Sequence, residues 1–138
     1  QLDASVAQRI RNTFDEHRSM LDIGKQGKLL HGDFHFKNIL YHQGRITGII
    51  DFEWANAGDP CWDFRLEEIW EADCVGSRRY IYDGYASYRP VDDDQMLRIR
   101  LYKMLQYVNE IIFFSQDQPD PKELQRYLKR LNALCATF

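Results

Sequence analysis

Three oxygen-bearing side chains lie close together in the sequence, beside apolar segments. Asp33 sits in a polar loop, Asn38 follows it five residues later, and Asp51 comes directly after an apolar run. Polar groups between apolar strands are costly to bury unless they pair or perform a function. A carboxylate and an amide oxygen are hard ligands that suit Mg²⁺, which completes its shell with water and phosphate oxygens. The pattern therefore predicts a magnesium site, with Asp33 placed to accept a proton from a hydroxyl.

A predicted β-hairpin explains how these residues meet. Gln43-Gly44 is a turn signal between two short apolar runs. With the turn there, Asn38 lies opposite Ile49 and within about two residues of Asp51, or roughly 7 Å along the strands. Both strand ends then open towards the loop that carries Asp33.

The segment from His31 to Phe64 closely resembles the aminoglycoside phosphotransferase and choline kinase-like family. That family has a histidine-glycine-aspartate loop, an asparagine five residues after the aspartate, and an isoleucine-aspartate-phenylalanine motif. A glycine-aspartate-proline and one further aspartate follow. The matching residues are His31-Gly32-Asp33, Asn38, Ile50-Asp51-Phe52, Gly58-Asp59-Pro60 and Asp63. Spaced elements in the same order, over about 34 residues, are far more specific than any one motif.

The resemblance implies transfer of the γ-phosphate of ATP, or of GTP, to a hydroxyl of a small molecule that is aminoglycoside-like or choline-like. It makes Asp33 the catalytic base and brings His35 near the transferred phosphate. Asn38 and Asp51 would bind Mg²⁺ and, with it, the nucleotide. We group His31 with these cofactor-binding residues, although we expect its ring mainly to hold the loop.

The substrate cleft has two further candidates, Glu53 and Trp54, which directly follow the metal motif. Acidic residues later in the chain, at 67–73 and 92–94, are either a recognition surface for a cationic substrate or a solvated helix face and helix start. We prefer the solvated interpretation for those residues. We expect Asp59 to cap the helix that begins at Pro60.

The fold expected from these patterns is α+β and mostly α. It is the carboxy-terminal, helical lobe of a protein kinase-like fold, with a small antiparallel β-hairpin carrying the catalytic and metal loops. We interpret residues 1–138 as a single domain. Periodicity and capping residues predict helices over 4–21, 60–73, 77–88, 93–115 and from 121 to 135, and strands at 28–30, 38–41 and 45–50.

The family's amino-terminal, nucleotide-binding lobe has no counterpart in this sequence, which starts with Gln rather than Met. We therefore expect a piece of a longer enzyme that binds ATP weakly and has little activity alone. The surface meant to face the other lobe should be apolar, which favours self-association.

Composition excludes several other classes of protein. The 138 residues carry a net charge of −3, which argues against a nucleic-acid partner. No wholly apolar run exceeds four residues, which is too short to span a membrane. Three widely spaced cysteines fit a reducing, cytoplasmic compartment.

Alternative interpretations remain open at this stage. Taken one at a time, Asp33, Asn38 and Asp51 are also ordinary turn and cap residues. The chain is alternatively a non-catalytic, kinase-like remnant that binds a ligand or a protein. Phosphorylation of protein side chains is disfavoured, because glycine occupies position 32, where protein kinases usually have arginine, and their peptide-binding signatures are missing.

Overall fold

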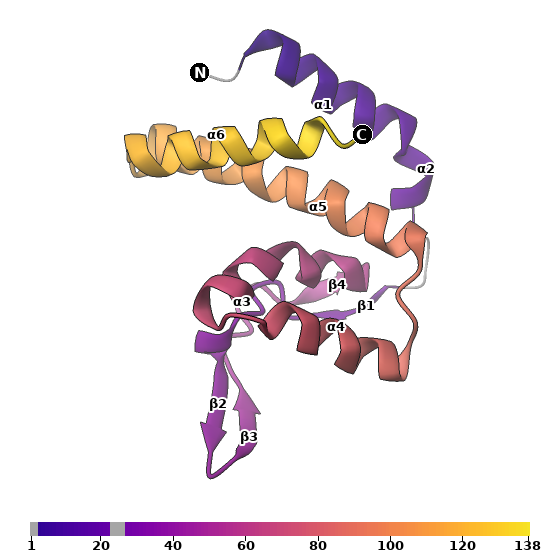
Figure 1. Ribbon diagram of the computed structural model, residues 1–138, viewed down its shortest axis with the longest axis vertical. Coiled ribbons are helices and arrows are strands. Elements are labelled where there is room, and N and C mark those ends of the chain that lie inside the picture. The colour runs from indigo at the N-terminus through magenta and orange to yellow at the C-terminus, as the bar shows by residue number, and fades with distance from the viewer. Residues whose placement is uncertain (1–2, 23–26) are drawn as a thin grey trace. The chain divides into compact units, whose positions relative to one another are not determined.

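The computed structural model describes residues 3–22 and 27–138, and it is mostly helical (Figure 1). The fold class expected from the sequence is confirmed. The helices are α1 (Ala4–Glu16), α2 (Arg18–Leu21), α3 (Glu67–Asp73), α4 (Ser77–Tyr88), α5 (Asp93–Ile112) and α6 (Pro121–Cys135); shorter helical segments are the 3₁₀ turns η1 (Phe36–Asn38) and η2 (Pro60–Leu66) and the π-helical turn η3 (Phe113–Asp117); the strands are β1 (Lys28–Leu30), β2 (Ile39–His42), β3 (Arg45–Ile49) and β4 (Asn56–Gly58). In the part described, none of the helices combines the length and hydropathy that a bilayer crossing requires.

The chain forms two compact units, and α5 contributes to both. In the first unit, which comprises the described residues up to Asp22 and Arg100–Phe138, α6 packs against the second part of α5 (Figure 1). Met104 and Leu131 are fully buried at this contact. The apolar stripe of α1 covers the same core with Val6, Ile10 and Phe14.

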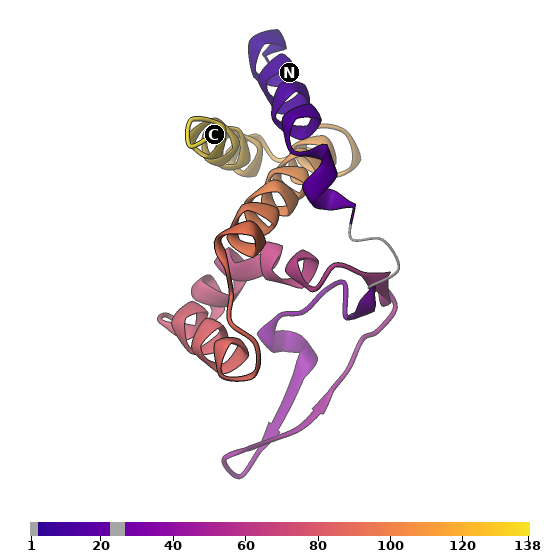
Figure 2. The same cartoon turned by 90° about the vertical axis from the view of Figure 1, so that its right-hand side faces the viewer.

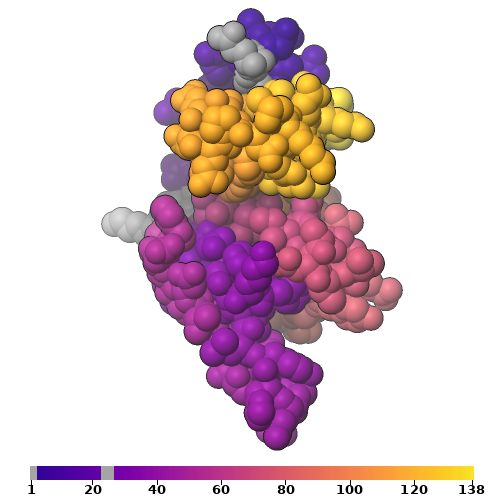
Figure 3. Space-filling view, turned by 90° about the vertical axis from the view of Figure 1, so that its left-hand side faces the viewer, coloured from indigo at the N-terminus to yellow at the C-terminus, as the bar shows by residue number. Residues whose placement is uncertain are grey.

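The second unit, Ile23–Ile99, carries the strands and the helices α3 and α4. Strands β1 and β4 pair antiparallel, and β2 and β3 form a separate antiparallel hairpin. Figure 2 shows this hairpin extending away from the β1–β4 pair, and in Figure 3 it is the narrow projection of the unit. Strand β1 directly precedes the segment 31–38 in the sequence and β2 directly follows it. The two strand pairs therefore fix both ends of the loop that carries Asp33.

The hairpin turn is where the sequence predicts it, but the register beyond it differs. Gln43 and Gly44 both have positive φ, as a tight hairpin turn requires. The predicted pairing of Asn38 with Ile49 is wrong: a bulge leaves Thr47 out of the strand register and shifts the pairing by one residue, and the Thr47 hydroxyl donates to the Leu40 carbonyl. The backbone N–H of Ile50 consequently donates to the carbonyl of Asn38.

Three predicted helices have different ends or geometry. The helix expected over 4–21 is interrupted at His17, whose ring bonds to the Thr13 carbonyl. The one expected over 60–73 begins as the 3₁₀ segment η2, and the one expected over 93–115 finishes as the π turn η3. Strand β4 was not predicted, because its sequence, Asn-Ala-Gly, is poor in strand-forming residues. The sequence also predicts that Gly24 and Gly27 end the first helix and open a turn, and Gly24 lies outside the described residues.

Candidate active site

The segment η2 holds the loop that contains Asp33. The carboxylate of Asp63 accepts the backbone N–H of His31 at Oδ2 and that of Gly32 at Oδ1, each at 2.9 Å. Asp59 caps the first turn of η2, as expected, by accepting the N–H of Cys61, and it pairs with Arg98 at 2.8 Å. A charged acceptor for two neighbouring N–H groups gives stronger bonds than a neutral one, so the start of the loop is firmly anchored.

The second of the two anchored residues, Gly32, has to be glycine. Gly32 has a φ of +83°, and an added Cβ would lie 2.3 Å from the Trp54 carbonyl oxygen. Both the backbone conformation and the close approach of the 54 peptide therefore exclude a side chain.

His31 links the loop to the end of strand β3. Its Nε2 lies 2.9 Å from the Ile50 carbonyl, to which it donates, and its Nδ1 accepts the N–H of Asp33 at 3.3 Å. The buried ring also packs against Phe52, with centroids 4.5 Å apart. Both ring nitrogens are thus used by the backbone, which fits the expected structural role and leaves neither nitrogen for a nucleotide.

The carboxylate of Asp33 is held from one side. Oδ2 lies 3.3 Å from Nε2 of His35 and 3.5 Å from the side-chain nitrogen of Asn38. The same Asn38 nitrogen donates to the Asp33 carbonyl at 2.9 Å. The other carboxylate oxygen, Oδ1, has no hydrogen-bond partner among residues 3–22 and 27–138. One oxygen is therefore oriented by neighbours while the second is available to an incoming group.

Asp51 adopts an unusual backbone conformation directly after Ile50. Its φ of +66° is rare for a residue other than glycine, and its side chain is exposed. Because Ile50 is hydrogen-bonded to Asn38 through the backbone, Asp51 and Asn38 are close along the paired segments. The amide nitrogen of Asn38 is occupied by Asp33, which leaves its oxygen Oδ1 as the atom that can bind a cation.

The two substrate candidates follow in the exposed turn at 52–55. Trp54 is 65% exposed, and its carbonyl accepts a hydrogen bond from Asn56. Glu53 is also exposed. Their side chains are open to solvent and accessible to a ligand, and the backbone of Trp54 lies close to Gly32.

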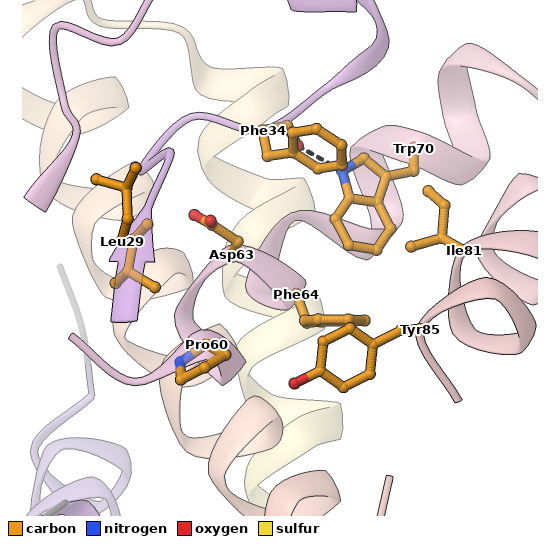
Figure 4. A pocket seen from close by; sticks show the side chains of 9 residues that line it. Leu29, Phe34, Pro60, Asp63, Phe64, Trp70, Ile81 and Tyr85 are labelled. Carbon is orange, nitrogen blue, oxygen red and sulfur yellow. Dashed lines mark hydrogen bonds between the residues drawn. The ribbon is translucent and has the colours of Figure 1, made fainter. Parts of the chain in front are cut away.

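Aromatic residues back the loop on its other side. Phe34, Phe64, Trp70 and Tyr85 gather beside Asp63 around a cavity of about 360 Å³ (Figure 4). The indole N–H of Trp70 donates to the Phe34 carbonyl. The loop thus rests on apolar packing through Phe34.

One contact of the loop was not predicted from the sequence. The guanidinium of Arg65 donates to the Gly32 carbonyl at 2.7 Å. The available signal was an arginine set between Phe64 and Leu66, both of which are buried. A charged residue in an apolar stretch commonly has a fixed polar partner.

A family model described as the phosphotransferase enzyme family matches residues 1–82. The chain belongs to this family. The resemblance inferred from the motifs is confirmed, since residues 1–82 include all of them. No curated protein matches the chain.

Solved structures share the fold of this chain. A thermostable mutant of aminoglycoside phosphotransferase APH(4)-Ia matches 99% of the chain at 21% identity, with a TM-score of 0.70 and 46% of its own length covered. Aminoglycoside 2'-phosphotransferase-IIIa, as a GDP complex, matches 99% at 22% identity, with a TM-score of 0.67 and 46% covered. Choline kinase LicA from Streptococcus pneumoniae matches 100% at 20% identity, with a TM-score of 0.63 and 50% covered. The chain therefore spans about half the length of these structures.

The tight approach at Gly32 can be tested by a matched pair of substitutions. Gly76 has nearly the same φ, +84°, but an added Cβ there meets nothing within 4 Å. Gly76→Ala should therefore cost only the left-handed strain, about 1–2 kcal/mol. Gly32→Ala adds a backbone clash and should cost at least about 2 kcal/mol more, at the upper end of single-site effects. Urea unfolding of both variants measures the difference, and equal losses would contradict the close approach.

Thiol reactivity tests the burial of η2. Burial, aided by the Asp59 carboxylate, raises the pKa of Cys61 to about 12, and burial also raises the pKa of Cys135, whereas Cys74 is exposed. Because the thiolate is the reactive form, a disulfide reagent at pH 8 should modify Cys74 alone in the folded protein. The variant Cys74→Ser should then react only after unfolding. Rapid modification of Cys61 in the native state would show that η2 is open.

Proposed function

We propose that this chain is the catalytic part of a small-molecule kinase that transfers the γ-phosphoryl group of ATP or GTP to a hydroxyl. The observation that carries the proposal is the carboxylate of Asp33, which has one oxygen oriented by His35 and Asn38 and the other available. A carboxylate that orients a hydroxyl is a recurring part of such transfer. Membership of the phosphotransferase family supports the same reaction class.

In the proposed reaction, Asp33 accepts the proton of the acceptor hydroxyl as the hydroxyl oxygen bonds to the γ-phosphorus and the bond to the departing ADP or GDP breaks. The available oxygen, Oδ1, is the atom that would take this proton. Nε2 of His35 lies 3.3 Å from Oδ2, and Nδ1 of the same ring accepts the backbone N–H of Lys37. This arrangement fixes the direction of the carboxylate and keeps His35 beside the place where charge shifts during transfer.

The residues expected to bind Mg²⁺ have suitable chemistry. Asn38 offers an amide oxygen and Asp51 an exposed carboxylate, which are hard ligands of the kind that Mg²⁺ takes in small number. Within residues 3–22 and 27–138, no three acidic, histidine or cysteine side chains gather into a metal site, and a site of one amide and one carboxylate does not need them. When bound, the ion would offset the negative charge of the nucleotide phosphates.

The substrate classes come from the similar structures. Two APH(4)-Ia variants were crystallised with hygromycin B and a nucleotide, AMP-PNP or ADP, and another relative is a choline kinase. For this chain we propose an aminoglycoside-like or choline-like alcohol, with Glu53 and Trp54 at the substrate side. His31 would support the cofactor site only indirectly, through Ile50 and Asp51.

The surface around the hairpin bears on the behaviour of the isolated chain. Its exposed apolar side chains are Leu40, Tyr41, Ile46, Ile49, Ile50, Phe52 and Trp54. We propose that this surface favours self-association when nothing covers it, and that the isolated chain binds nucleotide weakly and turns over little. The alternative, a non-catalytic remnant, would give no reason for the oriented Asp33 carboxylate.

The base and metal roles are separated by two substitutions in the full-length protein that carries this chain. Asp33→Asn should lower kcat by about 10²–10⁴, the usual contribution of a general base, with nucleotide affinity unchanged. Asp51→Asn should instead raise the Mg²⁺ concentration needed for half-maximal activity. Asp83→Asn, at an exposed ion pair with Arg79, is the control and should change neither quantity. If Asp33→Asn retained most of the turnover, the assignment of Asp33 would fail.

A further inference from the structure

We propose that Arg65 is a positioning residue for Asp33, acting through the peptide bond that joins Gly32 to Asp33. The inference rests on the proposed function, because it concerns the base of that reaction. Arg65 is buried, and it lies two residues after Asp63 on η2. The same short segment therefore holds the loop with the carboxylate of Asp63 and with the guanidinium of Arg65.

Both ends of this peptide are hydrogen-bonded. Its carbonyl oxygen, from Gly32, accepts from Nη2 of Arg65 at 2.7 Å. Its N–H, from Asp33, donates to Nδ1 of His31 at 3.3 Å. The orientation of the peptide plane sets φ of Asp33, so these two bonds determine where the Asp33 side chain starts.

This peptide is also the one in the loop that most needs external support. Gly32 has a φ of +83° and carries no Cβ, so its own backbone restricts ψ less than that of any other residue type. Rotation of the peptide would break both bonds at once and turn Asp33 away. A guanidinium donor gives a charge-assisted bond, which opposes this rotation more strongly than a neutral donor would.

Arg65 is itself held in place by its own segment. Nη1 donates to the Trp62 carbonyl at 3.0 Å, and the guanidinium carbon lies 4.1 Å from the centre of the Trp62 ring. The planar group thus serves two carbonyls and one aromatic face together. A lysine ammonium cannot reproduce that geometry, so Arg65→Lys should be only partly functional.

The first measurement does not depend on activity. In the full-length protein, amide hydrogen exchange at Asp33 should be about ten- to hundredfold faster in Arg65→Met than in the wild type, as expected for loss of a hydrogen bond to a charged group. Arg65→Lys should give an intermediate acceleration of at least about threefold. The control is Arg79→Met, the same change at an exposed arginine on α4 of the same unit. It should leave Asp33 at the wild-type rate.

The second measurement separates positioning from general destabilisation. With the phosphotransferase assay, Arg65→Met should lower kcat at least about tenfold while the nucleotide KM stays within about twofold, because Arg65 acts on the base and not on binding. Arg65→Lys should restore part of kcat. Wild-type exchange and wild-type kcat in both variants, or in Arg65→Lys alone if Arg65→Met does not fold, would overturn the inference. Faster exchange with unchanged kcat would also overturn it. If the wild-type protein had no phosphotransferase activity, the proposed function would be refuted. The exchange measurement would then still decide whether Arg65 holds the loop.

Discussion

The carboxylate of Asp63 is the contact on which the rest of the candidate site depends. It accepts two consecutive backbone N–H groups from a loop more than 30 residues earlier in the chain. Those N–H groups lie in a part-buried position, where a missing acceptor would cost about 1–3 kcal/mol each. The loop that leads to Asp33 is therefore fixed at its first two residues before any of its own side chains contribute.

From that anchor, a chain of hydrogen bonds to the backbone extends across the site. His31, held by its N–H, uses its ring to join the N–H of Asp33 to the carbonyl of Ile50. Ile50 in turn donates its N–H to Asn38, and Asp51 follows it in a left-handed conformation. A strained conformation of this kind is retained where the surroundings enforce it. Here Ile50, before Asp51, is hydrogen-bonded to Asn38 and His31, and Phe52, after it, packs on the His31 ring.

Residues of opposite charge on η2 hold different backbone groups of the loop. Asp63 binds N–H groups and Arg65 binds a carbonyl, so the Gly32 residue is held by its donor and by its acceptor from one short segment. Asp59, at the start of η2, is ion-paired with Arg98. The start of the segment is fixed by this ion pair, and its later residues Asp63 and Arg65 hold the loop.

Sequence reasoning succeeded where the signal is local. The turn at Gln43-Gly44 follows from residues that tolerate positive φ, and the cap at Asp59 follows from a side chain that accepts a nearby N–H group. The family was evident from the order and spacing of its motifs. These features need only a few neighbouring residues to be specified.

Features that depend on distant partners were not predictable. The bulge at Thr47 and the strand β4 exist because of pairing across the sheet, and neither leaves a clear local pattern. The 3₁₀ geometry of η2 and the contact of Arg65 with Gly32 arise from tertiary packing. The roles of Asp33, Asn38 and Asp51 stay a proposal that rests on their arrangement and on the family.

The most direct test of a cation site formed by Asn38 and Asp51 beside Asp33 is a titration of the isotope-labelled chain with Mn²⁺, followed by NMR line broadening. Even weak binding broadens signals near the ion. The account predicts that the side-chain amide of Asn38 and the backbone amides of Asp33 and Asp51 broaden first, and that Mg²⁺ in excess restores them. Broadening that begins at the acidic stretch Asp92–Asp94, with the loop signals unchanged, would contradict it.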